Sequence, residues 1–470
     1  MQITPQPENI FSTRMAQMNR SSAKLKRSDA AAYDRLKKLL LDKKAKVGVI
    51  GLGYVGLPLS MVFADAGFTV LGMDLSESKV KSLAKGESYI PDVPSKDVAK
   101  HTKTKKFQAF AGFEQLKNSN VIVICVPTPL SKTKDPDMSY IVSALDQIVN
   151  HLQPGQLVVL ESTTYPGTTR EYMLPRIESA GRENFGSFDC GKDFFLAFSP
   201  ERVDPGNPKF NTYNTPKVVG GITPECSDLA SIFYAQTVER VVKVSSPESA
   251  EMVKLLENTF RAVNIGLVNE VAIMCEKLKI DCWEVIEAAS TKPFGFMPFY
   301  PGPGLGGHCI PIDPSYLSWK LRSLNYTARF IELATSINSS MPHFVCDKVS
   351  AALNDASKSV KGSKILIMGV AYKKDIDDMR ESPAMDVIHT LHERGAKVEY
   401  YDPFVPEFEW EGMKMKSVAW TKDLAKKYDA VVITTDHSKI DYAALLKSSK
   451  VVIDTRNALK DFKDPRIMKL

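Results

Sequence analysis

The amino-acid sequence predicts an α/β protein in which two Rossmann-like parallel-sheet domains are joined by a long central helix. Two series of short apolar runs, interrupted by helical segments, indicate two parallel sheets. A helical pattern over about 245–278 separates them, and 470 residues are too many for one core. We expect a basic N-terminal extension over 1–45, a first α/β domain over 46–243, a central helical region over 244–355 and a C-terminal domain over 356–470.

The composition is typical of a soluble globular protein, with 44% hydrophobic and 25% charged residues. No apolar run approaches the ~20 residues that cross a bilayer, and the first nine residues lack the apolar segment of a secretory signal. The 7 cysteines are odd in number and include no Cys-x-x-Cys pair, which argues against a disulfide framework and a structural zinc site. We therefore expect a cytoplasmic protein with no membrane span and no metal.

The formal net charge of +6 is concentrated at the N-terminus. Residues 1–46 hold eleven basic and four acidic residues, which leaves 50 basic and 51 acidic residues in the remainder. A nucleic-acid-binding domain carries its excess charge on a folded face, so no nucleic-acid partner is expected. Residues 1–28 are predicted to be a polar tail, for which a transit peptide or a membrane-surface contact is an alternative.

A short helix is expected over 29–42, capped by Asp29. Tyr33, Leu36 and Leu40 share one stripe of this helix, which indicates that it docks on a neighbouring surface.

The first α/β domain opens with a strand, a glycine loop, a helix and a second strand. The loop is Gly51-Leu52-Gly53-Tyr54-Val55-Gly56, and the second strand ends at Asp74, 18 residues after Gly56. Such glycines allow a pyrophosphate to approach the helix N-terminus, and the acid suits the ribose hydroxyls. No arginine stands at 75–78 to hold a 2′-phosphate. The motif therefore predicts a site for NAD rather than NADP, formed by Gly51, Gly53, Tyr54, Val55, Gly56 and Asp74.

Three further apolar runs, over 121–126, 157–160 and 194–198, are continuous, as in strands covered on both faces. Ligands of open α/β sheets bind beyond the carboxyl ends of the strands, although simple strand termination is the alternative. The polar segments at these ends are Pro127-Thr128-Pro129, Glu161-Ser162-Thr163-Thr164 and Ser199-Pro200-Glu201-Arg202.

The central helix begins with Ser245-Ser246-Pro247-Glu248, a typical helix start. Its apolar residues keep a helical spacing, and they are Val253, Leu256, Phe260, Val263, Leu267, Val271 and Met274. A helix of this kind between two domains suits a homodimer contact, with an internal core helix as the alternative. Lys254 and Asn258 lie one turn apart on another face.

The loop over 301–314 is rich in glycine and proline and surrounds Cys309. A thiol held in such a rigid, accessible loop is a candidate nucleophile, and a small buried thiol in a turn is the alternative. After it, strands at 364–368, 398–401, 430–434 and 450–453 indicate a second α/β unit. This unit lacks a full G-x-G-x-x-G and is expected to bind a nucleotide, but not a second dinucleotide.

Together these motifs resemble the UDP-glucose/GDP-mannose dehydrogenase family over about 46–460. Ser-Pro-Glu-Arg-Val at 199–203 and Gly-Gly-His-Cys-Ile-Pro-Ile-Asp-Pro at 306–314 are similar to the UDP-N-acetylhexosamine branch, whereas the glucose branch typically has Asn-Pro-Glu-Phe-Leu and Gly-Gly-Ser-Cys. The segments at 161–167 and 329–334 resemble the UDP-N-acetyl-D-glucosamine 6-dehydrogenases in particular. The resemblance implies that NAD oxidises the C6 alcohol of a UDP-sugar, UDP-GlcNAc first among the candidates, to a carboxylate for polysaccharide precursors.

The resemblance also implies the catalytic roles. Lys254 and Asn258 would hold the C6 oxygen, with Asp313 beside Lys254. Cys309 would form a thiohemiacetal and then a thioester. Glu201 would be the base for its hydrolysis, and Thr163 would position water or cofactor.

Weaker correspondences place Thr128 and Arg380 at the cofactor. Lys373 and Arg456 correspond to positions that hold the UDP phosphate or sugar, and Gly306 is expected to join Lys254 and Asn258 at the substrate. The glucose branch has a second glutamate four residues after the one that matches Glu201, but this sequence has Pro205 there, and Arg202 is the expected substrate contact instead. UDP-glucose and UDP-ManNAc remain alternative substrates. A metal site at His308 and Cys309, a cysteine hydrolase and a nucleotide sensor are the alternatives from other classes.

Overall fold

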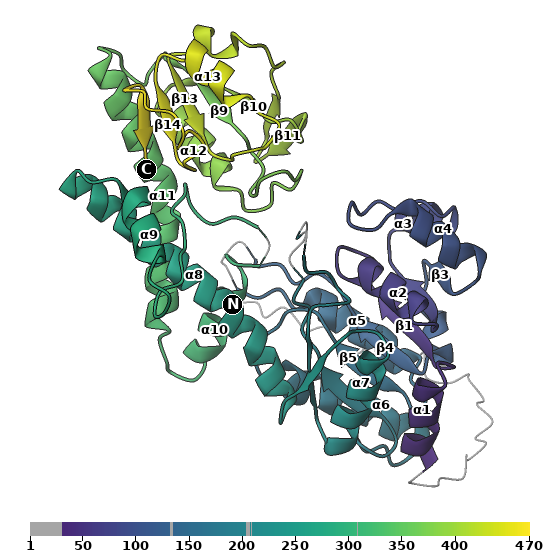
Figure 1. Cartoon of the computed structure of the whole chain (residues 1–470). Helices are drawn as coiled ribbons and strands as arrows, with labels where there is room; N and C mark the ends of the chain where they lie inside the picture. The colour runs from purple at the N-terminus through teal and green to yellow at the C-terminus, as the bar shows by residue number, and fades with distance from the viewer. Residues whose placement is uncertain (1–30, 132–134, 204–206, 208, 308) are drawn as a thin grey trace, which may run out of the picture.

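The computed structural model describes residues 31–131, 135–203, 207, 209–307 and 309–470. It contains two α/β domains at opposite ends of the molecule, with the long helices α8 (Pro247–Leu278) and α11 (Arg329–Asp355) between them (Figure 1). The predicted fold class is confirmed. Within the described ranges, no helix is both long and apolar enough to cross a bilayer.

The N-terminal domain is built on one eight-stranded sheet with the order β3-β2-β1-β4-β5-β6-β7-β8. Neighbouring strands are parallel except for β6 and β7, which pair antiparallel. Its strands are β1 (Lys46–Ile50), β2 (Thr69–Met73), β3 (Phe107–Phe110), β4 (Val121–Ile124), β5 (Leu157–Leu160), β6 (Phe195–Phe198), β7 (Lys217–Gly221) and β8 (Val241–Lys243). Its helical elements are α1 (Ala31–Leu41), α2 (Gly56–Asp65), α3 (Glu77–Ala84), α4 (Ser95–Lys103), η1 (Glu114–Asn118), α5 (Ser139–Asn150), η2 (Thr168–Met173), α6 (Leu174–Phe185) and α7 (Pro224–Ala235).

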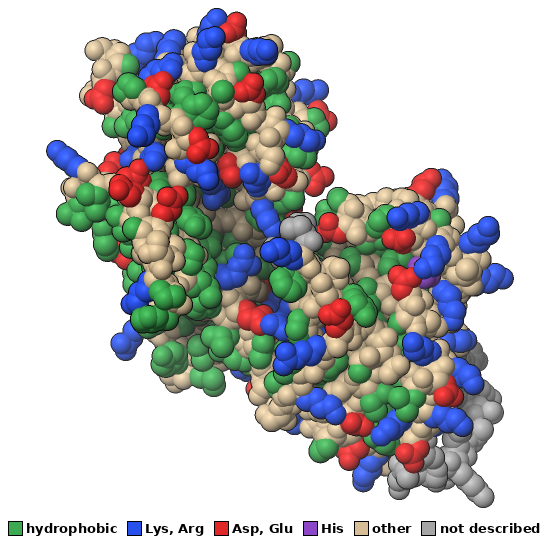
Figure 2. All heavy atoms as spheres, in the orientation of Figure 1, with side chains coloured by type: hydrophobic (Ala, Val, Ile, Leu, Met, Phe, Trp, Pro, Cys, Tyr) green, Lys and Arg blue, Asp and Glu red, His purple; other side chains and the backbone are tan. Residues whose placement is uncertain are grey.

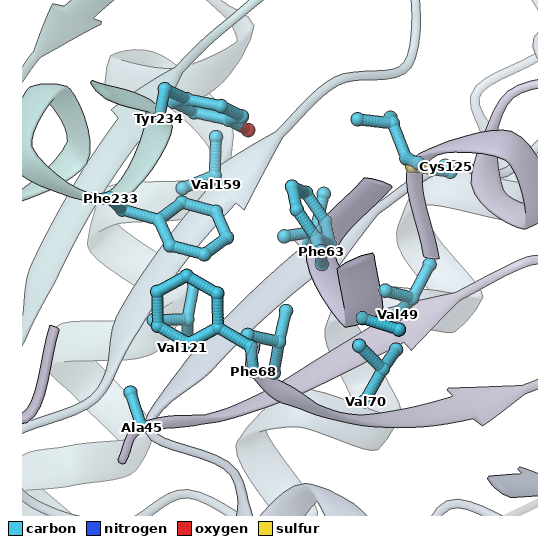
Figure 3. Close-up of a cluster of buried hydrophobic side chains, with 14 of the residues drawn as sticks. Ala45, Val49, Phe63, Phe68, Val70, Val121, Cys125, Val159, Phe233 and Tyr234 are labelled. Carbon is cyan, nitrogen blue, oxygen red and sulfur yellow. The ribbon is translucent and has the colours of Figure 1, made fainter. Parts of the chain in front are cut away.

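The order of this sheet reverses between β1 and β4, and a ligand site is expected at such a switch point. Every residue of β4, β5 and β6 is buried, which explains their unbroken apolar sequences. On one face, aromatic rings of α2 and α7 fill the core (Figure 3). The Phe63 and Phe233 rings lie 4.9 Å apart between centroids, and Phe68 packs at 5.6 Å from Phe233.

Helix α1 docks on this domain, as its apolar stripe predicted. Leu36 and Leu40 are buried, and the Tyr33 hydroxyl donates a 2.5 Å hydrogen bond to Asp228 on α7. The proposed cap Asp29 lies outside the described residues.

The central region contains α8, α9 (Cys282–Ser290), α10 (Asp313–Arg322) and α11. The Ser246 hydroxyl accepts from the Ser249 backbone N–H and caps α8. Helices α8 and α11 approach closely at Gly266, where an added Cβ would lie 3.1 Å from Ala334 Cα. Beside this point, the Asn269 side chain donates to Asn338 at 2.8 Å.

The apolar stripe predicted on α8 does not form the buried face of the helix. Leu256, Phe260, Leu267 and Met274 are all exposed in the chain. The face packed against α11 instead contains small residues, because two backbones in close contact leave no room for large ones.

The C-terminal domain has a five-stranded parallel sheet with the order β10-β9-β13-β14-β15 and a separate antiparallel hairpin of β11 and β12. Its strands are β9 (Lys364–Met368), β10 (Lys397–Tyr401), β11 (Glu407–Trp410), β12 (Met413–Lys416), β13 (Ala430–Ile433), β14 (Val452–Asp454) and β15 (Ile467–Lys469). Its helical elements are α12 (Pro383–Glu393), η3 (Leu424–Lys427) and α13 (Tyr442–Ser448). The hairpin and β15 were not anticipated from the sequence.

Candidate active site

A cleft of about 1710 Å³ lies between the two domains, against α8 and the loop that carries Cys309. Figure 2 shows the hollow between the two lobes of the molecule, with basic side chains along its edges. Most of the residues predicted from the sequence line this cleft. They are Tyr54, Val55, Thr128, Thr163, Glu201, Arg202, Lys254, Asn258, Gly306, Cys309, Asp313, Lys373 and Arg380.

The glycine loop has the geometry of a pyrophosphate cradle. Gly51 adopts φ +89°, and an added Cβ there would lie 2.6 Å from the Cys125 carbonyl oxygen. A Cβ on Gly56 would lie 1.8 Å from the Gly51 oxygen, whereas a Cβ on Gly53 would meet nothing within 4 Å. No side chain caps the N-terminus of α2. The loop is therefore tight on its protein side and open on the other, which fits a dinucleotide.

Asp74 follows β2 and closes the same loop. Its carboxylate accepts from the backbone N–H groups of Leu52 and Ser76, both at 2.9 Å. Lys79 Nζ is 3.4 Å from its Oδ2. Asp74, the residue predicted to bind the ribose hydroxyls, is thus anchored to the glycine loop and keeps lone pairs free for a sugar hydroxyl.

Cys309 lies four residues before Asp313, the first residue of α10, in a loop that is hydrogen-bonded to the C-terminal domain. Gly307 has φ +90° and donates its N–H to the Arg380 carbonyl at 2.9 Å. The Cys309 carbonyl accepts from the Asp313 N–H at 2.8 Å. Burial raises the pKa of the Cys309 thiol, the charge of Lys254 opposes that rise, and Asp313 adds to it. His308 lies outside the described residues.

The pair predicted on α8 meets Asp313 and Cys309. Asn258 Nδ2 donates to Asp313 Oδ2 at 2.5 Å. Burial raises the pKa of Asp313 to about 6, against the opposing charge of Lys254 and the hydrogen bond from Asn258. The charge of Lys254 also opposes the rise in the pKa of Cys309 and contributes to the lowered pKa of Glu201, so it lies within electrostatic reach of all three groups. A cation so placed can stabilise developing negative charge on a substrate oxygen.

Glu201 follows β6 and is held by its own turn. Its Oε1 accepts from the backbone N–H groups of Arg202 and Val203, both at 2.9 Å. The Arg202 guanidinium pairs with Glu257 on α8, at 3.1 Å from Nε and 2.5 Å from Nη2. Arg202 therefore lines the cleft while already engaged with a protein carboxylate.

Arg380 joins the two domains across the cleft. Its guanidinium lies 5.0 Å from the centroid of the Tyr54 ring in the glycine loop. It also makes bidentate contacts with Asp378, the closest at 2.6 Å. Thr128, in the segment after β4, is contacted from α10: the Tyr316 hydroxyl donates to the Thr128 carbonyl at 3.0 Å.

Arg456 lies elsewhere. Its guanidinium packs against Gly302, where an added Cβ would be 2.5 Å from Nη1, and its Nε donates to the Thr434 carbonyl at 2.9 Å. Arg456 is not among the cleft-lining residues, whereas Lys373 is. Its proposed substrate contact stays a prediction.

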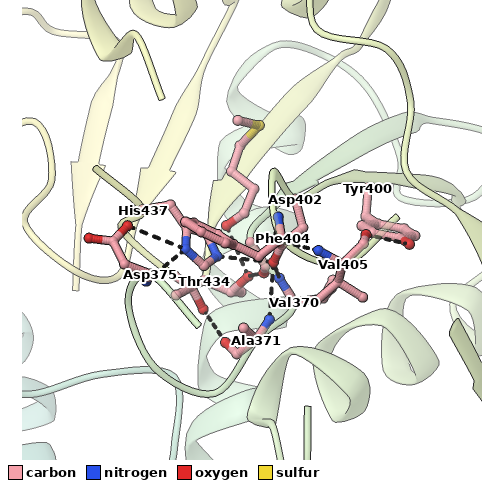
Figure 4. Close-up of polar contacts among 12 residues, drawn as sticks. Val370, Ala371, Asp375, Tyr400, Asp402, Phe404, Val405, Thr434 and His437 are labelled. Atoms are coloured by element: carbon pink, nitrogen blue, oxygen red, sulfur yellow. Dashed lines mark hydrogen bonds and ion pairs between the residues drawn. The ribbon is translucent and has the colours of Figure 1, made fainter. Parts of the chain in front are cut away.

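In the C-terminal unit an aspartate, Asp402, anchors the loop after β9 much as Asp74 anchors the glycine loop, but side chains of the same domain also contact this aspartate (Figure 4). Asp402 follows β10 as Asp74 follows β2, and its Oδ2 accepts from the Val370 and Ala371 N–H groups at 2.7 and 3.1 Å. Buried His437 contacts the same oxygen at 3.0 Å and accepts from the Asp375 N–H through Nδ1. Phe404 packs on the His437 ring. These groups occupy the Oδ2 atom of Asp402, and it stays a prediction that this unit binds a nucleotide but not a second dinucleotide.

Sequence reasoning missed three polar groups at this site. Arg261 lines the cleft one turn beyond Asn258, so the helical spacing from Lys254 could have found it. Lys217 and Tyr234 contact Glu161 at the base of the cleft, but they come from separate elements and left no signal in the sequence. Among the described side chains, no group of three or more His, Cys, Asp or Glu is placed to hold a metal ion.

A glycine loop for a dinucleotide, a facing thiol and lysine, and a second nucleotide unit define an NAD-dependent oxidoreductase. Comparison with family models identifies the particular kind. The NAD binding domain of the UDP-glucose/GDP-mannose dehydrogenase family matches residues 45–238, its central domain 248–340 and its UDP binding domain 366–461. The chain belongs to this family of nucleotide-sugar dehydrogenases.

Several relatives match most of the chain. The UDP-N-acetyl-D-glucosamine 6-dehydrogenase of Pseudomonas aeruginosa is 35% identical over 364 residues, 77% of this chain and 84% of the relative. The UDP-N-acetyl-D-mannosamine dehydrogenase of Pyrococcus horikoshii is 35% identical over 428 residues, 88% of this chain and 96% of the relative. A solved structure of UDP-D-ManNAc dehydrogenase from Pyrococcus horikoshii has a TM-score of 0.81 at 34% identity, covering 90% of this chain and 98% of its own.

Proposed function

We propose that this chain oxidises the C6 alcohol of a UDP-N-acetylhexosamine, with UDP-GlcNAc as the first candidate, to the uronic acid. The observation that carries the proposal is the convergence of Lys254, Asn258, Asp313, Cys309 and Glu201 on one cleft between the NAD binding and UDP binding domains. This set contains a cation, a nucleophile and a base, which an oxidation from alcohol to acid requires.

Lys254 and Asn258 are the proposed holders of the C6 oxygen. When bound, NAD⁺ would supply the oxidising power, with a separate NAD⁺ for the hydride of each of the two oxidations. The Lys254 ammonium stabilises the negative charge that develops on the C6 oxygen when the C6 hydroxyl loses its proton. Asp313 accepts a hydrogen bond from Asn258 and interacts electrostatically with Lys254, and it is proposed to keep the lysine in place.

Cys309 is the proposed nucleophile. Its sulfur adds to the C6 aldehyde and gives a thiohemiacetal, whose oxidation gives a thioester. Water then adds to the thioester carbonyl and gives its proton to Glu201, and the C–S bond breaks to release Cys309 and the carboxylate product. Thr163 lies in the same wall of the cleft and is proposed to position the water or the cofactor.

Two NADH per sugar and dependence on the thiol test this route. We expect purified protein to release two NADH for each UDP-GlcNAc consumed, measured by absorbance against product quantification. Cys309→Ser should stop net formation of the acid, because an alkoxyl group gives no equally reactive acyl intermediate. One NADH per sugar, or an active Cys309→Ser variant, would rule out the covalent step.

UDP-ManNAc is the second candidate substrate, favoured by the UDP-N-acetyl-D-mannosamine dehydrogenases that match this chain at 33% to 35% identity. We expect kcat/KM for UDP-GlcNAc to exceed the values for UDP-ManNAc and UDP-glucose in a side-by-side assay. A preference for UDP-glucose would contradict the proposed N-acetylhexosamine specificity.

The protein is proposed to work in the cytoplasm as a homodimer and to supply precursors of surface polysaccharides. All seven cysteines are free, which suits a reducing compartment. The exposed apolar residues of α8 support a second copy as partner, since such patches mark interfaces.

A further inference from the structure

Lys217 on β7 lies buried behind the wall of the cleft. Its side chain is 5% exposed, and its Nζ is 3.0 Å from Glu201 Oε2 and 2.5 Å from Glu161 Oε2. The Tyr234 hydroxyl donates to the other oxygen of Glu161, and Lys217 Nζ lies 5.3 Å from the centroid of the Tyr234 ring. Figure 3 shows Tyr234 beside Phe233 at the edge of the apolar core.

Burying these charged groups costs free energy of folding. A buried ion pair gains little over apolar residues of the same volume, because desolvation offsets the Coulomb attraction. Here one ammonium contacts two carboxylates, the fully buried Glu161 and the partly buried Glu201, and both line the cleft while the lysine does not. The contacts therefore point to a role for Lys217 that is exerted on the cleft through its partners.

We propose that Lys217 is a positioning residue for Glu201, holding this carboxylate ionised and fixed so that it can accept the proton of the hydrolytic water, while Glu161 and Tyr234 hold the lysine. The inference rests on the proposed function, in which Glu201 is the base that deprotonates the hydrolytic water. The backbone fixes Oε1 of Glu201 and Lys217 fixes Oε2, so the carboxylate cannot rotate freely.

The charges around Glu201 agree with this role. Burial alone would raise the pKa of Glu201, but Lys217, assisted by the Val203 N–H and by Lys254, holds it below its ordinary value. Glu161 beyond β5 is the opposing anion, and burial raises the pKa of its carboxyl. The Cys125 thiol beyond β4 also faces this group, and burial raises its pKa well above normal.

The test follows decay of the acyl-enzyme, the step assigned to Glu201. With enzyme in excess over UDP-GlcNAc, the intact mass of quenched samples records formation and loss of acyl-Cys309 at each pH. The acid limb of the profile is the pH range below which the decay rate falls as Glu201 becomes protonated. In Lys217→Met we expect this limb to move to higher pH by roughly one to three units, because a nearby cation lowers a carboxyl pKa by that much. Below the limb, the acyl-enzyme should persist about tenfold longer per pH unit.

Two variants separate this role from simple structural support. Glu161→Gln breaks the buried Lys217–Glu161 pair but leaves Lys217 in contact with Glu201, so the acid limb of this variant should not move to higher pH. Lys217→Arg keeps the cation and should restore the wild-type limb. An equal upward shift in Lys217→Met and Glu161→Gln, or none in Lys217→Met, would overturn the inference.

If Lys217→Met does not fold, the double variant Lys217→Met/Glu161→Gln removes both members of the pair. It should still show an upward shift, smaller than that of Lys217→Met because the opposing anion Glu161 is removed as well, and an unmoved limb there would equally overturn the inference. The proposed function fails separately: wild-type enzyme that shows no acyl-Cys309 mass, or one NADH per sugar, contradicts the covalent route whatever the variants do.

Discussion

Asp313 is buried between α10 and α8, and burial governs its ionisation. Its carboxyl accepts from Asn258 and interacts with the charge of Lys254, yet its pKa is raised to about 6 from the ordinary value of 3.8. A carboxyl whose pKa is higher in the folded state favours folding while protonated. That contribution is fully present below the unfolded pKa and is lost as the pH rises through about 6.

Asp313→Asn should therefore gain stability relative to the wild type as the pH rises from about 4 to 7. Removing the cost of a buried charge makes this relative gain about 2 to 3 kcal/mol across the interval. Urea unfolding at several pH values measures it. The same variant should lose at least about tenfold in kcat, since Lys254 loses its anionic partner. A stability difference that does not vary with pH would contradict the assigned ionisation.

Contacts between elements of the fold place the proposed catalytic groups relative to one another, and Glu251 on α8 is an example. Its carboxylate accepts from the Gly167 N–H at 2.6 Å and from the Thr169 N–H and hydroxyl at 3.0 and 2.7 Å. These groups begin η2, directly after the segment that carries Thr163. One buried side chain thus joins the helix of Lys254 to the end of β5.

Glu251→Ala should destabilise the protein by roughly 3 kcal/mol, because two buried backbone N–H groups lose their acceptor. Chemical denaturation measures the loss. Glu248→Ala is the matched control: Glu248 lies one turn earlier on α8 and pairs with the Arg170 side chain near the surface. Exposed pairs contribute roughly 0 to 1 kcal/mol, so equal losses in the two variants would contradict the role given to Glu251.

The loops of the C-terminal domain depend on Asp402. Its Oδ2 holds the loop after β9, and its Oδ1 accepts from the Phe404 and Val405 N–H groups at 2.8 and 3.1 Å. Because Lys373 follows that loop, Asp402→Ala should raise KM for the UDP-sugar severalfold and leave KM for NAD nearly unchanged. Steady-state kinetics with each substrate varied test this, and parallel changes in both KM values would argue against it.

The molecule as a whole leaves a large apolar surface on its central region. On α8, Leu256 is 57% and Leu267 56% exposed, and on α11 Phe330 is 76% and Leu333 57% exposed. Surfaces of this kind mark protein–protein interfaces, and the proposed occupant is a second copy of the chain.

Light scattering should give about twice the chain mass of 52.1 kDa for the wild type. Leu267→Asp should shift the protein toward the monomer, because a buried unpaired charge is costly at an apolar interface. Leu41→Asp, at a 52% exposed leucine on α1, is the control and should leave the mass unchanged. A monomeric wild type, or a dimeric Leu267→Asp variant, would refute this interface.

The sequence predicted the buried strands well, because a strand covered on both faces leaves a continuous apolar run. The run over 157–160 coincides with β5, and the run over 121–126 overshoots β4 by two residues. The β11–β12 hairpin was missed although Glu407–Trp410 alternates and Gly412 marks its turn. Its short strands lie outside the main sheet, so no buried apolar run distinguishes them.

The sequence by itself determined the glycine loop for NAD, and it was enough to propose the roles of Lys254 and Asn258, one turn apart, and of a thiol in a rigid loop, because these signals are local in the chain. Only the tertiary structure decided which face of α8 is buried and which charge faces Glu201. Those outcomes depend on distances between elements far apart in sequence, such as β7 with Lys217 and the turn after β6. Burial and Coulomb interactions act through space, and no spacing along the chain encodes them.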